Sequence, residues 1–152
     1  MFNKQIDYYR RKINEVKEKV NDKTLSITAK MLNFDLEKLE DEFKNNSVEF
    51  KKFAYSVAKS LSKGVVKSEV YCGVIIYFAE KYEMNYKLYA GFCLPEDHPK
   101  YKDEVKKVED LKAEGKEHPC VATHTYVEIG DKTYELFNNS FSGIGHIDVV
   151  EL

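Results

Sequence analysis

The stretch SEVYCGVIIYFAEKYEMN, residues 68–85, decides the fold of this chain of 152 residues. It sets an apolar run with helical spacing directly behind a Tyr-Cys-Gly sequence. After Asn85 the period changes, because apolar residues then occupy every second position, which is typical of a strand with one buried face. The alternating residues are Tyr86, Leu88, Ala90, Phe92 and Leu94. A buried helix followed by a half-buried strand predicts an α+β core.

Helical spacing also governs the chain before this stretch. Residues 3–20 carry apolar side chains at steps of three and four, which predicts an amphipathic helix. The same spacing recurs at Leu32, Leu36, Leu39 and Phe43. Ser47 is a suitable N-cap for a further helix that Gly64 closes. We therefore expect three helices before residue 68.

Past the alternating strand, residues 95–119 are dense in charge and poor in apolar residues. This composition predicts an insertion that leaves the core, with one exposed helix over residues 101–113. Two further strands are expected at residues 122–129 and 132–137, because Gly130-Asp131 between them suits a tight hairpin turn. The insertion thus interrupts an otherwise antiparallel sheet.

A last strand is expected at residues 147–152. The order of elements is then helices first and an antiparallel sheet after, with one helix packed on the sheet. We see no internal repeat, and the length suits one domain. The predicted organisation is a single domain, 1–152, with a helical part at 1–64 and a core at 65–152.

Composition limits the partners and the compartment. The chain interleaves 24 basic with 26 acidic residues for a formal net charge of -2. No face is basic enough to bind a phosphate backbone, so nucleic acid is not expected as a partner. No apolar run reaches the roughly 18 residues of a membrane span, so no membrane partner is expected. Three cysteines and a charged N-terminus predict reduced thiols and a cytoplasmic protein.

Cys72 is the candidate nucleophile. A thiol attacks as thiolate, and the positive end of a helix dipole or a neighbouring imidazolium lowers its pKa. With Ser68 as N-cap, Cys72 lies in the first turn, where unpaired backbone N–H groups point at a developing oxyanion. Gly73 beside it would let a substrate backbone approach closely. The alternative is a small buried side chain, since free cysteines are among the most buried residues.

A base for this thiol is expected among four histidines. His98 and His118 lie in the charged insertion and His146 lies in the glycine-flanked segment GIGHID, whereas His124 is on a strand, the more rigid position. A third group should orient the imidazole from the adjacent strand. The sequence YELFNN, residues 134–139, follows at a suitable distance.

These residues resemble the transglutaminase-like branch of the papain-type cysteine enzymes over roughly residues 68–138. The similar segments are Tyr71-Cys72-Gly73 opening an apolar helix, YKLYAGFCLP at 86–95 and HTYVEIGDKTYELFN at 124–138. The resemblance implies a transglutaminase-like fold with a Cys-His-Asn triad of Cys72, His124 and Asn138. Asn138 departs from the Asp of transglutaminases but matches papain-type enzymes, and Tyr126 stands where the family usually has Trp.

The register of the hairpin leaves the third member open. A two-residue turn sets His124 across from Phe137 and puts Glu135 diagonally on its sheet face. A three-residue turn instead sets His124 opposite Asn138, but with poorer patterning of the remaining pairs. Asn138 is therefore the first candidate, with Glu135 and Asn139 behind it.

Two functions follow from the resemblance. The first is a cysteine-dependent hydrolase or acyltransferase, in which Cys72 attacks a peptide or glutamine amide while His124 moves the proton. This chemistry requires no cofactor and no metal. The second is a catalytically inactive fold used as a protein-binding or inhibitory module, for example one encoded on a mobile genetic element. A separate alternative is a zinc ion that clips the ends of the insertion through Cys93, His98, His118 and Cys120.

Overall fold

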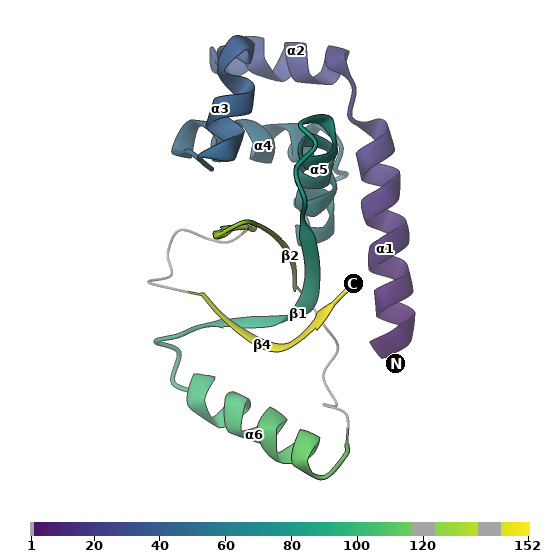
Figure 1. The fold of residues 1–152 in the computed structure, drawn as a ribbon, viewed down its shortest axis with the longest axis vertical. Helices are drawn as coiled ribbons and strands as arrows, with labels where there is room; N and C mark the ends of the chain where they lie inside the picture. Colours follow the sequence, from purple (N-terminus) through teal and green to yellow (C-terminus); the bar gives the residue numbers. More distant parts are fainter. Residues whose placement is uncertain (1, 117–123, 137–143) are drawn as a thin grey trace.

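The computed structural model describes residues 2–116, 124–136 and 144–152, and these residues form an α+β fold (Figure 1). The helices are α1 (Phe2–Lys19), α2 (Asp22–Leu32), the short 3-10 helix η1 (Leu36–Lys38), α3 (Leu39–Lys44), α4 (Val48–Ser60), α5 (Ser68–Lys81) and α6 (Tyr101–Ala113). The strands are β1 (Lys87–Pro95), β2 (His124–Ile129), β3 (Lys132–Tyr134) and β4 (Ile144–Glu151). The predicted class, helices followed by a small antiparallel sheet, is confirmed.

The second predicted helix is wrong, because the stripe from Leu32 to Phe43 belongs to three separate helical elements, α2, η1 and α3. Asn33 takes the left-handed conformation (φ 55, ψ 42) and its N–H bonds back to the last turn of α2. Asp35 then caps η1 by accepting a hydrogen bond from the Glu37 N–H. A left-handed Asn ends a helix without disturbing the apolar spacing, so the periodicity hides the break.

The start of the third predicted helix and the bounds of the helix in the insertion agree with the structure, but α4 ends at Ser60 and not at Gly64. The Ser47 hydroxyl accepts a hydrogen bond from the Phe50 N–H at 3.0 Å and so caps α4. Helix α6 has the predicted bounds and is mostly exposed, but it is not detached from the sheet. Val108 is buried, and the ring of Tyr101 lies so close to Gly145 of β4 that a Cβ there would meet it.

The sheet has the strand order β3-β2-β1-β4, with antiparallel neighbours. Gly130 has φ 62, and the pair Ile129–Lys132 flanks the two-residue turn that the sequence predicts. Strand β4 pairs with β1 along the other edge, with a register shift between Ala90 and Phe92. The chain therefore returns past β2 and β1 to add its last strand on the far side.

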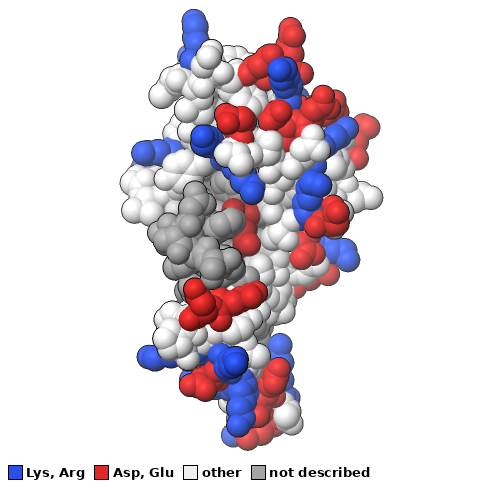
Figure 2. Space-filling view, turned by 90° about the vertical axis from the view of Figure 1, so that its left-hand side faces the viewer, with Lys and Arg blue, Asp and Glu red and all other residues white. Residues whose placement is uncertain are grey.

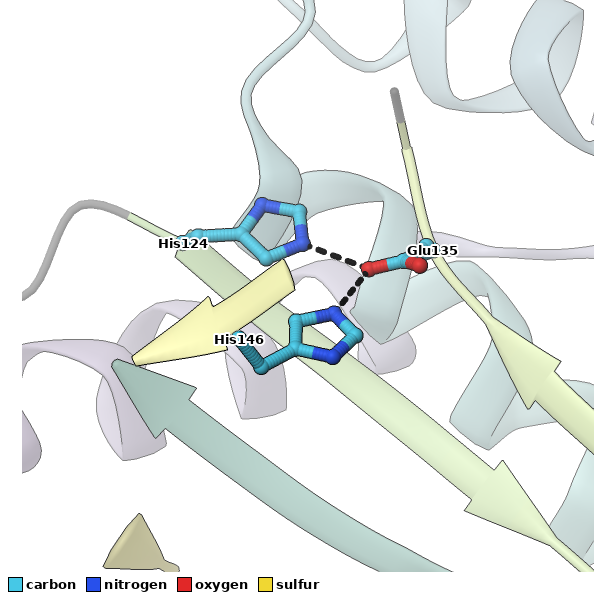
Figure 3. Close-up of side chains that lie close together, drawn as sticks. All are labelled: His124, Glu135 and His146. Atoms are coloured by element: carbon cyan, nitrogen blue, oxygen red, sulfur yellow. Dashed lines mark hydrogen bonds and ion pairs between the residues drawn. The ribbon is translucent and has the colours of Figure 1, made fainter. Parts of the chain in front are cut away.

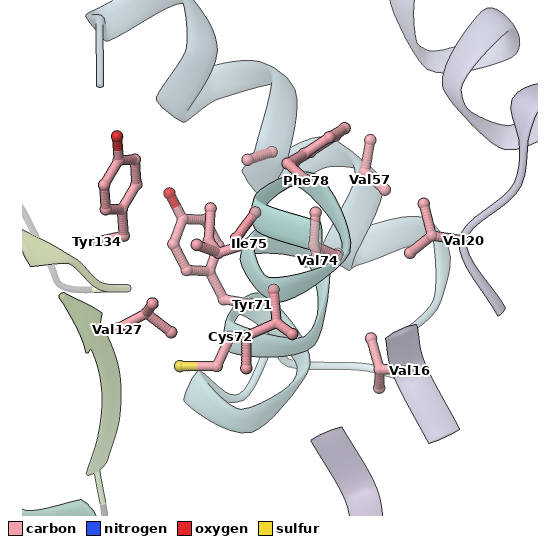
Figure 4. Close-up of a cluster of buried hydrophobic side chains, with 14 of the residues drawn as sticks. Val16, Val20, Val57, Tyr71, Cys72, Val74, Ile75, Phe78, Val127 and Tyr134 are labelled. Atoms are coloured by element: carbon pink, nitrogen blue, oxygen red, sulfur yellow. The ribbon is translucent and has the colours of Figure 1, made fainter. Parts of the chain in front are cut away.

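Helix α5 lies at the centre of the molecule and contacts α1 on one side and β2 on another. Its residues Val74, Ile75 and Phe78 have no exposed surface. Figure 4 shows these side chains between Val16 of α1 and Val127 of β2. Because α5 is covered on several sides, apolar residues occupy nearly its whole circumference and not one stripe.

Phe43 joins the short helix α3 to the rest of the core. Its buried ring contacts several other rings, with centroid distances between 5.2 and 5.9 Å: Phe50, Phe78, Tyr82 and Tyr134. The Tyr134 hydroxyl also donates a hydrogen bond to the Phe43 carbonyl at 2.6 Å. Phe43 thus ties α3, α4, α5 and β3 into one cluster.

Within the described part of the chain, none of the helices combines the length and the apolar character needed to cross a membrane. On the face shown in Figure 2, Lys and Arg side chains lie interspersed with Asp and Glu side chains. The described residues of this face therefore form no continuous basic area that could bind a phosphate backbone.

Candidate functional site

The structure buries Cys72 completely, with no exposed surface. Its thiol donates a hydrogen bond to the Thr125 hydroxyl at 3.3 Å, and its sulfur points toward β2 in Figure 4. The Thr125 hydroxyl in turn donates to the Ser68 hydroxyl at 3.2 Å. Cys72 therefore belongs to a short chain of buried polar groups that joins α5 to β2.

The start of α5 differs from the expectation. Lys67 is the N-cap residue, and no side chain caps the helix. The Ser68 side chain bonds to β2 instead, because its hydroxyl also accepts a hydrogen bond from the Thr125 N–H at 3.1 Å. The Tyr71 N–H already bonds to the Lys67 carbonyl, so Cys72 lies past the unpaired N–H groups that would favour a thiolate or an oxyanion.

The surroundings of Cys72 raise the pKa of its thiol to about 12. Burial is the main cause, since it disfavours the charged thiolate. The hydrogen bond to Thr125 lowers the pKa, while the charges of Glu69 and Glu135 raise it. These are the features of an unreactive core cysteine and not of an activated nucleophile.

Gly73 has a packing role in the structure. A Cβ at this position would lie 2.6 Å from the Cβ and Cγ1 atoms of Val16 and 3.0 Å from the Ile13 carbonyl oxygen. Helix α1 thus occupies the space that the sequence analysis assigned to a substrate backbone. Gly73 allows α1 and α5 to approach closely.

His124 faces the opposite side of β2 from Thr125, because successive side chains alternate along a strand. Its Nε2 atom lies 2.8 Å from Glu135 Oε2, and His146 Nε2 lies 2.7 Å from the same oxygen. Figure 3 shows the two imidazoles converging on this carboxylate from different strands. We call His124, Glu135 and His146 the His-Glu-His cluster.

The register of the hairpin explains how Glu135 reaches His124. Val127 pairs with Tyr134, which confirms the two-residue turn and places Glu135 diagonally from His124 on the same face. The residue that patterning favoured is thus the one that contacts the imidazole. Asn138 and Asn139, the other candidates for the third position, lie outside the described residues.

His146 is the member that the sequence analysis did not connect with His124. It lies on β4, two strands away from β2, and pairs with Cys93 of β1. Gly91 of β1 pairs with His124, so the strand between the two histidines carries a residue without a side chain on this face. The rings of His124 and His146 therefore approach to 5.9 Å between centroids, at 15°.

A stack of aromatic rings holds the cluster. Tyr126 stacks on His146 at 4.1 Å between centroids and on His124 at 6.0 Å. Tyr89 of β1 also stacks on Tyr126, at 5.3 Å between centroids. Because the rings are nearly parallel, each restricts the rotation of the next.

Glu135 is ionised in this cluster. Burial alone would raise its pKa, but the hydrogen bonds and charges of His124 and His146 outweigh burial and lower the pKa to about 2. An ionised carboxylate only accepts hydrogen bonds, so both Nε2 atoms act as donors when no ion is bound. The site is a partly buried negative charge between two imidazoles.

The structure brings His124 and Glu135 within hydrogen-bonding distance, but among the described residues the thiol of Cys72 bonds to Thr125 and not to His124. The zinc site expected from Cys93, His98, His118 and Cys120 is untested, because His118 and Cys120 lie outside the described residues.

Comparison with protein-family models, curated proteins and solved structures finds no match for this chain.

Proposed function

We propose that this chain is a transglutaminase-like fold that acts as a protein-binding or inhibitory module and performs no thiol chemistry. The observation that supports this proposal is the complete burial of Cys72, whose thiol is held by Thr125 on β2. An attacking sulfur must come within roughly 3 to 3.5 Å of a carbonyl carbon. A side chain with no exposed surface offers no such approach.

The second candidate function is a cysteine-dependent hydrolase or acyltransferase acting on a protein or peptide amide. The bond between His124 and Glu135 at 2.8 Å favours it, because an oriented imidazole is what a general base requires. This function needs a conformation in which Cys72 leaves Thr125 and its thiol reaches His124, whose side chain faces the other side of β2. The third member is then Glu135, or Asn138 as the family resemblance implies.

Alkylation of the native protein by iodoacetamide, measured for each cysteine by mass spectrometry from pH 6 to 10, separates the two functions. We expect Cys72 to react about 1000-fold more slowly than in the chain unfolded by urea at pH 8. A thiol pKa of about 12 against an ordinary 9.0 leaves about one thiolate in 10,000 instead of one in 10, and burial slows the reaction further.

The matched variant for this measurement is His124→Ala. If Cys72 has no imidazole partner, the variant leaves its protection unchanged as long as circular dichroism shows the native fold. Fast alkylation of Cys72 below pH 8, ahead of Cys93 and Cys120 and lost in His124→Ala, would contradict the binding module. That result would establish a thiolate–imidazolium pair and the second function.

A further inference from the structure

We propose that the His-Glu-His cluster binds one divalent transition-metal ion, with Zn²⁺ as the best fit. The ligand atoms of His124, Glu135 and His146 all lie within 4.8 Å of one another. This inference goes beyond the proposed function and does not depend on it, since the thiol of Cys72 takes no part in the site.

The donor set suits such an ion. Two imidazole nitrogens and one carboxylate oxygen are a combination found in catalytic zinc sites and in non-haem iron sites. Hard ions such as Mg²⁺ and Ca²⁺ prefer oxygen ligands throughout, so the pair of histidines disfavours them. The carboxylate of Glu135 would offset one of the two positive charges that the ion brings.

The distances fit after a small adjustment. In a tetrahedral zinc site with bonds of about 2.1 Å, ligand atoms lie about 3.4 Å apart. The two Nε2–Oε2 distances are 2.8 and 2.7 Å, so each histidine moves outward by roughly 0.6 Å. Both Nε2 atoms must lose a hydrogen on binding, and the rings then carry their hydrogens on Nδ1.

The site is formed before an ion arrives. His124 begins β2 and His146 lies on β4, while Glu135 directly follows β3, so two ligands lie on strands and the third lies next to the end of one. The stack of Tyr126 on His146 limits the rotation of the rings. A rigid sheet is a better support for a metal site than loops, because the ligands lose little freedom on binding.

The cluster is closed on one side and accessible on the other. The side chains of His124 and Glu135 are 7% and 9% exposed, whereas His146 is 24% exposed. An ion can therefore enter past His146 and displace the hydrogens from both rings. The described residues supply three ligands, one fewer than the four of a tetrahedral zinc site.

The test is a titration of protein that has been freed of metals with a chelator. We expect one Zn²⁺ per chain by calorimetry, and Co²⁺ should give the visible absorption of a tetrahedral site. His146→Gln and Glu135→Gln should each weaken Zn²⁺ binding at least 10-fold, since even changes to outer-shell partners cost about 10- to 100-fold. His146 is the preferred position for substitution, because it is the most exposed of the three ligands and its replacement disturbs the fold least.

The matched control is His98→Ala, which removes an exposed histidine of the insertion and should leave Zn²⁺ affinity unchanged. Loss of binding in His98→Ala alone would overturn the proposal and assign the ion to the insertion. Absence of stoichiometric binding by folded wild-type protein would also overturn it. Long-range ¹H–¹⁵N spectra of the wild-type histidines provide a check without mutation: Zn²⁺ should leave both rings as Nδ1–H tautomers.

These results are independent of the alkylation of Cys72. A protected Cys72 with no bound ion supports the binding module and rejects the metal site. A reactive Cys72 with one bound ion rejects the binding module and supports the metal site.

Discussion

Phe43→Ala should lower the free energy of unfolding by about 4 kcal/mol, within the range of 3 to 5 kcal/mol for removing a fully buried Phe ring. Phe43 has no exposed surface. Its ring is the common neighbour of rings on α4, α5 and β3, so its removal opens a cavity where four elements meet. Urea denaturation gives the change in the free energy of unfolding. It is followed by circular dichroism, because the chain contains no Trp for a fluorescence measurement.

The control for Phe43 is Tyr55→Ala on α4. Tyr55 is also aromatic but 41% exposed, so its removal should cost less than about 1 kcal/mol. If both variants unfold at the same urea concentration, the Phe43 cluster does not hold α3 to the core. The aromatic contacts would then not be the reason that α3 packs where it does.

Local patterns predict much of this fold because they depend on neighbours along the chain. The Ser47 cap, the bounds of α6 and the Gly130-Asp131 hairpin each follow from a few adjacent residues and are confirmed. The break at Asn33 was not predicted, because a left-handed Asn leaves the apolar spacing intact. Patterning thus detects the buried face of a helix better than its end.

The candidate site depends on contacts that are distant in sequence, and there the prediction is partial. The register of the hairpin predicts Glu135 as a neighbour of His124, since both belong to one hairpin. His146 was not linked to them because strand order is set by the packing of the whole sheet. The predicted last strand, residues 147–152, leaves His146 out, whereas β4 begins at Ile144 and includes it.

Burial of Cys72 could not be derived from the sequence. A cysteine near a helix start looks the same whether the helix end faces a cleft or a strand. Thr125 on β2 determines which of the two occurs. Its hydroxyl accepts a hydrogen bond from Cys72, and its N–H donates one to Ser68. Both partners of Thr125 were singled out in the sequence, but Thr125 itself carries no motif signal.

Gly73→Ala should destabilise the protein by about 2 kcal/mol, although alanine is the better helix former. In an exposed helix the change would stabilise by up to about 1 kcal/mol. Here the added Cβ would lie 2.6 Å from two atoms of Val16, which forces α1 away from α5. Overpacking of this kind costs about 1 to 3 kcal/mol, and backbone contact with the Ile13 carbonyl leaves little room for relief.

A double-mutant cycle with Val16→Ala separates this packing effect from helix propensity. Val16→Ala removes one of the two clashing atoms, so the double variant should be more stable than the sum of the single changes predicts. A purely additive result in urea denaturation would mean that α1 does not press on Gly73. Helix α1 would then be free to move from α5, and the glycine would again be open to an approaching partner. A favourable coupling instead means that this face of α5 is closed by the chain itself, so any partner must bind elsewhere.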